Sequence, residues 1–177
     1  MLRERRWQVA VSGLVLAAGA YALAGWMFGL MIVAGTWVVP AWVPSAALLV
    51  VAFVVALVRR VRLSWPSRVV AVLTSAVALL SWVGDLSATY TVLPASPDGC
   101  RVVVRESSFL FAGDGEVFLT SPFGIGPGMG TYQTDDGYRP VTVGDYEFRW
   151  ESGVGRLSFT GNSTDPILRS TIRTLEC

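Results

Sequence analysis

The stretch WQVAVSGLVLAAGAYALAGWMFGLMIVAGTWVVPAWVPSAALLVVAFVVALV, residues 7–58, contains no charged side chain. A bilayer core about 30 Å thick is crossed by roughly 20 apolar helical residues. The stretch is therefore too long for one membrane span and about right for two. Pro40 and Pro44 fall where a turn is needed, because proline breaks helices. We predict one span at about 8–35 and a second at about 42–58.

A second apolar segment follows a short arginine-rich loop. Between Val69 and Leu93 the only charged residue is Asp85. Pro66 precedes this segment, at a position where the first turn of a helix tolerates a missing N–H group. We predict a third span at about 67–90, so that residues 1–93 form a three-helix transmembrane domain.

The distribution of arginine predicts the orientation of these spans. The seven arginines of residues 1–90 lie either before the first span or in the 59–68 loop. Cytoplasmic loops carry the excess of positive charge, so we expect the N-terminus and this loop in the cytoplasm. The C-terminal part then lies outside the plasma membrane. A cleaved signal peptide over Arg3–Ala24 is the weaker alternative, because the apolar run continues past its cleavage sites.

From Cys100 onward, short β-type runs alternate with glycine-rich turns. The clearest run is 145–151, in which aromatic residues alternate with charged ones and thus predict a strand with one buried face. Other runs follow the same pattern less strictly. The predicted strands are 101–106, 108–112, 116–120, 145–151 and 156–160, with turns at 113–115 and 152–155.

The last segment, 166–176, is compatible with a helix or a strand, and its β-branched residues favour the strand.

Together, these segments predict an α+β membrane protein. Three transmembrane helices are followed by a linker at 94–99 and by a small antiparallel β sandwich or barrel of about six or seven strands at 100–177.

The chain has two cysteines, Cys100 and Cys177, at the two ends of the predicted β domain. A domain this small has little core, and extracytoplasmic domains of this size often carry disulfides. We predict a bond between the two cysteines, with two free thiols as the alternative. In the chain-entropy view it contributes on the order of 4 kcal/mol.

The composition excludes several kinds of active site. The chain has neither histidine nor lysine, which removes Ser-His-Asp, Cys-His and Ser-Lys nucleophilic sites and zinc sites of the usual His/Cys type. Residues 91–177 carry seven arginines against eleven acidic residues, a balance that argues against a nucleic-acid partner. We expect no catalytic, cofactor-binding or metal site, and we expect a protein that is not an enzyme.

Three features remain as candidates for function. Asp85, the only ionisable residue inside a predicted span, lies roughly 25 Å above the start of that span, which favours a solvated interfacial residue over an ion or proton site. Gly25 and Gly29 form a GxxxG pattern for helix packing within the unit or for a homo-oligomer. The glycine-rich loop at 123–130 is a plain connection or a mobile partner-binding loop with Phe123, Ile125 and Met129 as its apolar contacts.

Two segments, Cys100-Arg-Val-Val-Val-Arg-Glu-Ser-Ser-Phe-Leu110 and Asp135-Asp-Gly-Tyr-Arg-Pro140, resemble small uncharacterised membrane proteins of actinobacteria with three N-terminal spans and a Cys-bounded extracellular β domain. The resemblance implies the compartment and no activity. We expect a non-enzymatic cell-envelope protein, embedded in the lipid bilayer, whose β domain binds a protein or envelope partner or acts as an accessory subunit. A small transporter or channel component, and a carboxylate-dependent cell-wall hydrolase, are the alternatives.

Overall fold

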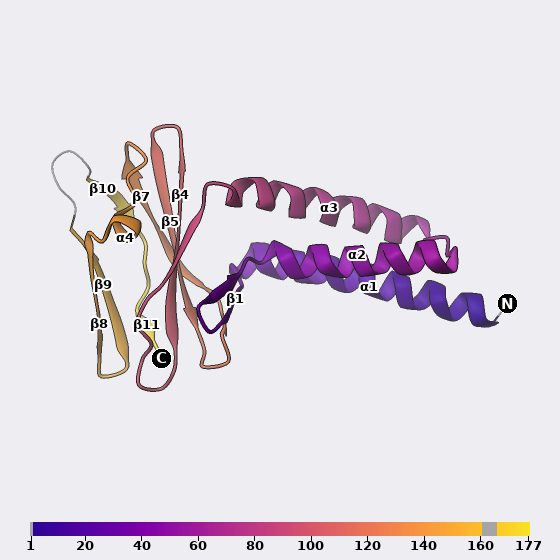
Figure 1. Cartoon of the computed structure of the whole chain (residues 1–177), viewed down its shortest axis with the longest axis horizontal. Helices are drawn as coiled ribbons and strands as arrows, with labels where there is room; N and C mark the ends of the chain where they lie inside the picture. The colour runs from indigo at the N-terminus through magenta and orange to yellow at the C-terminus, as the bar shows by residue number, and fades with distance from the viewer. Residues whose placement is uncertain (1, 161–165) are drawn as a thin grey trace. The chain divides into compact units, whose positions relative to one another are not determined.

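The chain folds into a helical unit and a β unit. The computed structural model describes residues 2–160 and 166–177 (Figure 1). The helical unit comprises Met1–Phe28 and Pro40–Val83, and the β unit comprises Gly29–Val39 and Gly84–Cys177. The β domain was predicted to start at Cys100 after a linker at 94–99, whereas the β unit starts sixteen residues earlier, at Gly84. It also includes the connection between the first two helices.

Three long helices, α1 (Leu2–Phe28), α2 (Trp42–Arg59) and α3 (Trp65–Asp85), make up the helical unit almost entirely. Each is long and apolar enough to cross a membrane. They pack through a narrow contact centred on Val11, Val15 and Ala52. Most of their large apolar side chains instead face outward and are exposed. A helix that shows apolar side chains all round needs an apolar environment.

The second predicted span, 42–58, agrees with α2, whereas the third, 67–90, runs five residues past the end of α3 at Asp85. The first predicted span, 8–35, also extends too far. Helix α1 ends at Phe28, and Gly29 takes a left-handed φ of +58° that stops the helix. The chain then forms an antiparallel hairpin from β1 (Met31–Ala34) and β2 (Trp37–Val39). A short apolar run is ambiguous between helix and buried strand, which explains the error.

In the described residues, the β unit contains three antiparallel sheets. The largest has the order β10-β7-β5-β4-β3, and the two smaller ones have the orders β2-β1-β6 and β11-β9-β8. A four-residue helix, α4 (Pro140–Val143), follows β7. The remaining strands are β3 (Thr89–Val92), β4 (Arg101–Phe109), β5 (Ala112–Thr120), β6 (Ile125–Gly126), β7 (Gly128–Asp135), β8 (Tyr146–Glu151), β9 (Val154–Phe159), β10 (Ile167–Ser170) and β11 (Leu175–Glu176).

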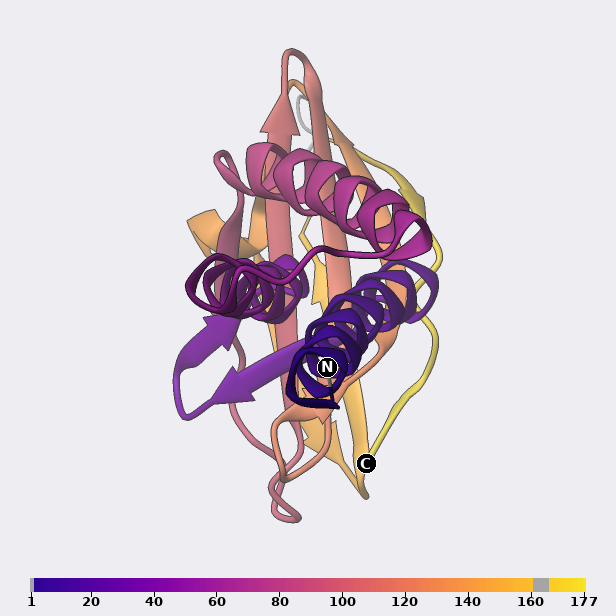
Figure 2. The ribbon, with the colours of Figure 1, turned by 90° about the vertical axis from the view of Figure 1, so that its right-hand side faces the viewer.

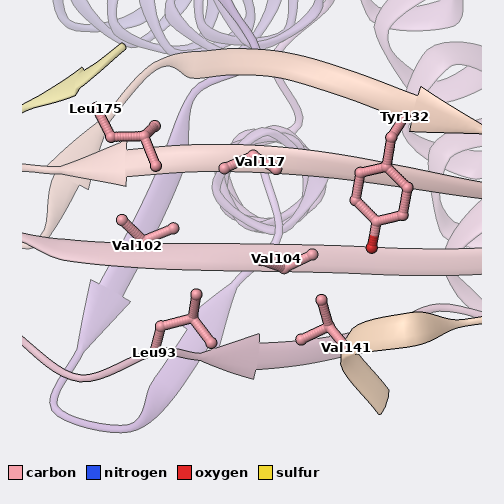
Figure 3. Packing of buried hydrophobic residues seen from close by; sticks show 7 residues of the cluster. All are labelled: Leu93, Val102, Val104, Val117, Tyr132, Val141 and Leu175. Atoms are coloured by element: carbon pink, nitrogen blue, oxygen red, sulfur yellow. The ribbon is translucent and has the colours of Figure 1, made fainter. Parts of the chain in front are cut away.

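The five-stranded sheet buries side chains on both of its faces. Val102, Val104 and Tyr132 point into the main core (Figure 3). Residues of β8, β9 and β11 pack against this core. On the opposite face, Val103 and Phe118 pack against the β1–β2 hairpin, which Figure 2 shows in purple. The β unit is thus a sandwich with a third, smaller layer supplied by the connection between α1 and α2.

Several predicted elements are confirmed. The hairpin of β8 and β9 has its aromatic residues half-buried and the intervening charged residues exposed. The segment 166–176 forms strands β10 and β11, so the helical alternative is wrong. The predicted disulfide joins Cys100 and Cys177, whose Cα atoms are 5.9 Å apart.

The turn predicted at 113–115 is wrong. Strands β4 and β5 pair without interruption up to Phe109 and Ala112, and the chain reverses at Leu110, which has a φ of +54°. Gly115 lies inside β5, where the ring of Tyr132 covers it and leaves no room for a side chain. A Cβ atom added at Gly115 would come within 2.0 Å of Tyr132 Cζ. The glycine therefore serves packing and not chain reversal.

Candidate interaction surfaces

The β4–β5 hairpin ends in an exposed apolar tip formed by Phe109, Leu110 and Phe111. Each of these side chains is more than three quarters exposed. Large apolar residues that are adjacent and solvent-exposed on a folded domain are typical of contact sites. We call Phe109–Phe111 the hairpin tip.

The hairpin tip is held in place by hydrogen bonds at its base. The Gly137 amide donates a 3.2 Å bond to the Phe111 carbonyl oxygen. Arg139 donates to Ser108 Oγ at 2.5 Å and to Thr89 Oγ1 at 3.2 Å. A loop that is fixed before binding loses less conformational entropy when it binds. The tip is therefore suited to present its apolar side chains without rearrangement.

Acidic residues border the hairpin tip. Asp135 lies opposite Ala112 in the register of β5 and β7, and Asp136 follows it with a φ of +50°. Both side chains are exposed. An apolar protrusion beside two carboxylates is complementary to an apolar pocket that has basic groups at its edge.

The sheet β2-β1-β6 presents a second apolar surface. Ile32 lies opposite Val39 on one side and Ile125 on the other. Because side chains alternate along a strand, Trp37 points to the same side as Val39. The opposite side of this sheet is buried in the β unit. We call the surface formed by Ile32, Trp37, Val39 and Ile125 the outer hairpin face. Trp37 is 79% exposed and Ile125 is 53% exposed.

The three apolar residues of the predicted partner-binding loop do not lie on one surface. Phe123 is 91% exposed and Ile125 belongs to the outer hairpin face. Met129, however, packs against the main core. The loop between them is tied down because the Val33 amide donates a 2.6 Å bond to the Gly124 carbonyl oxygen. Met129 therefore does not lie on the same surface as Phe123 and Ile125, and a partner contact of this loop stays a prediction.

Asp85 occupies the end of α3 and belongs to the β unit. Its Oδ1 accepts bonds of 2.9 Å from Arg105 and from the Tyr90 hydroxyl. Arg105 also pairs with Glu116 at 3.2 Å. Burial, the charge of Asp85 and the bond to it raise the pKa of Tyr90. Burial lowers the pKa of Arg105, but attraction from Glu116, Tyr90 and Asp85 outweighs it and the pKa is raised. The partly buried pair of Asp85 and Arg105 fixes the end of α3 to strand β4.

Glu106 is a buried carboxylate that no sequence pattern singled out. Only 1% of the residue is exposed, and its oxygens accept four hydrogen bonds, from Tyr132, from the Val141 amide, and from the amide and hydroxyl of Thr142. The sequence nevertheless allows its inward orientation to be predicted, because Glu106 continues the inward-facing alternation of Val102 and Val104. These donors surround Glu106 completely, so it joins β4, β7 and α4 as a structural group.

The two glycines of the GxxxG pattern have different environments. An added Cβ atom at Gly25 would lie 3.1 Å from the Cβ atom of Ala41, so this glycine allows a close approach inside the helical unit. Gly29 lies beyond the end of α1 with a positive φ. The pattern therefore does not form one helix face, because the helix ends before its second glycine.

Comparison with known protein families, curated proteins and solved structures finds no match to this chain. Within residues 2–160 and 166–177, no three His, Cys, Asp or Glu side chains form a group that could hold a metal ion. The hairpin tip and the outer hairpin face are the exposed apolar surfaces of the β unit described above.

Proposed function

We propose that this chain is a non-enzymatic cell-envelope membrane protein. Its three helices cross the plasma membrane with the N-terminus in the cytoplasm, and its β domain, on the extracytoplasmic side, binds a protein or envelope partner or acts as an accessory subunit. The hairpin tip is the observation that carries the proposed binding role. It is an ordered apolar protrusion with an acidic border.

Chain connectivity supports the orientation. The C-terminal end of α1, the N-terminal end of α2 and the C-terminal end of α3 all continue directly into the β unit. The opposite helix ends carry the seven arginines of the N-terminal half. One set of helix ends therefore carries no arginine and is joined to a disulfide-bonded domain, and the other is basic. Positive charge favours the cytoplasmic side, and disulfides favour an oxidising compartment.

The chemistry of the hairpin tip defines the partner that would fit it. Phe109 and Phe111 offer large apolar side chains, and aromatic side chains supply much of the binding energy at protein interfaces. Asp135 and Asp136 beside them favour a partner with arginine or lysine around an apolar pocket. We infer that the partner is a protein with such a pocket in the same membrane or in the adjoining envelope.

Site-specific photo-crosslinking in intact cells tests this proposal. A benzophenone amino acid replaces Leu110 at the tip in one variant and Leu168 on β10 in the other. Leu168 is also exposed, at 61%, and serves as the matched control. We expect a crosslinked protein adduct from position 110 that is absent from position 168. Replacing Phe109 and Phe111 by serine should reduce the yield of that adduct at least several-fold.

Two results would contradict the binding role. Equal adduct patterns at positions 110 and 168 would show that the tip has no preferred neighbour. An adduct at position 110 that survives the double serine change would show that the phenyl rings do not mediate the contact.

A further inference from the structure

We propose that the outer hairpin face rests in the outer headgroup layer of the lipid bilayer and holds the β domain against the membrane surface. This inference assumes the membrane anchoring of the proposed function and adds a second, peripheral contact to it. The hairpin tip would then be presented at a fixed height above the bilayer and would not move freely on a tether.

The connections between the hairpin and the helices are short. Helix α1 ends at Phe28 and β1 starts at Met31, while β2 ends at Val39 and α2 starts at Trp42. An extended chain covers at most about 3.6 Å per residue, so each strand end lies within about 11 Å of a helix end. The headgroup layer on one side of a bilayer is roughly 5–8 Å thick. With α1 and α2 ending at the lipid boundary, as proposed, Met31 and Val39 therefore lie within or just above the headgroup layer.

The hairpin and its connections are uncharged and lie next to exposed tryptophan side chains. Residues 29–40 contain no charged side chain. Trp37, which is 79% exposed, projects from the outer hairpin face, and Trp26, which is 80% exposed, projects from the last turn of α1. Tryptophan concentrates at the boundary between lipid and water because its ring is apolar and its N–H group is polar. Lipid headgroups are therefore the surroundings that fit this surface.

The hairpin is attached rigidly to the rest of the β domain. Met31 and Val33 are buried against the five-stranded sheet. Arg101 donates a 2.8 Å bond to the Gly35 carbonyl oxygen at the turn of the hairpin. The outer hairpin face thus cannot rotate independently of the sheet. A contact between that face and lipid would set the orientation of the whole β domain.

Spin-label accessibility on the full chain tests the inference. The chain carries a single added cysteine with a nitroxide label, keeps its native disulfide, and is reconstituted in vesicles of phosphatidylcholine and phosphatidylglycerol. The test variant is Ile125→Cys, with Trp37→Cys as a second position in case the first does not fold. Val54→Cys in the middle of α2 is the lipid control, and Leu168→Cys is the water control. The measurement compares collisions of the label with oxygen, which concentrates in lipid, and with a water-soluble nickel chelate.

We expect the oxygen-to-nickel collision ratio at Ile125 to be several-fold higher than at Leu168 and to approach that at Val54. A ratio at Ile125 equal to that at Leu168, with Val54 in lipid, would overturn the headgroup contact and leave the anchoring intact. Exclusion of both reagents at Ile125 would indicate a protein contact, such as a second copy of the chain, and would also overturn it. A water-like ratio at Val54 would instead contradict the anchoring itself.

Discussion

The Tyr132 hydroxyl donates a 2.5 Å hydrogen bond to the buried carboxylate of Glu106, and it reaches across Gly115 on the strand between them. The three residues form one row across β4, β5 and β7. The central glycine makes room for the tyrosine ring, and the ring brings a donor to a carboxylate inside an apolar core. This row connects the sheet to α4, beside the base of the hairpin tip.

Replacing Glu106 by glutamine should destabilise the β domain by about 2 kcal/mol or more. The amide group of glutamine faces donors on every side and leaves at least one of them unpaired in the core. Glu116→Gln is the control, because its pair with Arg105 is more exposed and such pairs contribute at most about 1 kcal/mol. Chemical unfolding in detergent, monitored by near-ultraviolet circular dichroism, gives the free energy of unfolding of each variant. Equal losses would contradict the role assigned to Glu106.

Gly115→Ala should cost about 3 kcal/mol, because its Cβ atom would overlap the ring of Tyr132 and force the core apart. Gly13→Ala is a matched control, since an added Cβ atom there meets nothing within 4 Å and alanine favours a helix. Thermal unfolding in detergent measures both variants. A Gly115→Ala protein as stable as the parent would show that the ring does not lie over this glycine.

Asp85→Asn should lower the stability of the β domain by about 2 kcal/mol, because it removes the negative partner of the partly buried Arg105. Glu151→Gln, which breaks the exposed pair with Arg156, should change stability by less than about 0.5 kcal/mol. A neutral effect of Asp85→Asn on unfolding, together with loss of an ion flux in liposomes, would favour the channel alternative over the structural role.

The stability of the β domain should fall as the pH rises above about 10, the ordinary pKa of tyrosine. Burial, the hydrogen bond to Glu106 and the charge of Glu106 raise the pKa of Tyr132 in the folded state. In that pH range the unfolded chain releases the tyrosine proton while the folded chain keeps it, so unfolding is favoured. In Tyr132→Phe the decline with pH should be less steep, as pH-dependent unfolding curves will show. An unchanged slope would contradict the raised pKa.

Loss of the disulfide, in the variant with Cys100→Ser and Cys177→Ser, should remove on the order of 4 kcal/mol of stability, because the bond closes a long loop with a sequence separation of 77 residues. A reducing agent should destabilise the parent by the same amount and have no further effect on the double variant. Unfolding in detergent with and without the reductant provides the comparison. A parent that is insensitive to reduction would contradict the stabilising role.

The sequence predicted the features that follow from strong periodicity or from composition. The apolar runs located α2 and α3, alternation located β8 and β9, and two cysteines at the ends of one domain predicted their bond. Each of these signals is local, or involves only one possible pair of residues.

The features that sequence reasoning missed depend on tertiary contacts. The segment 29–39 is as apolar as the helix before it, so only the pairing of β1 with β2 and with β6 shows that it forms strands. The reversal at Leu110 lacks a glycine or proline, whereas Gly113 and Gly115 imitate a turn and in fact make room for other side chains. One feature of the sequence indicates the hairpin tip: three consecutive large apolar residues, Phe109–Phe111, interrupt the alternation of β4.

Labelling of added cysteines in intact cells with a membrane-impermeant maleimide tests the proposed topology most directly. Leu168→Cys places a thiol on an exposed position of the β domain, and Ser64→Cys places one in the loop between α2 and α3. We expect Leu168→Cys to be labelled in intact cells and Ser64→Cys only after the cells are opened. Labelling of Ser64→Cys in intact cells, with Leu168→Cys protected until lysis, would contradict the account.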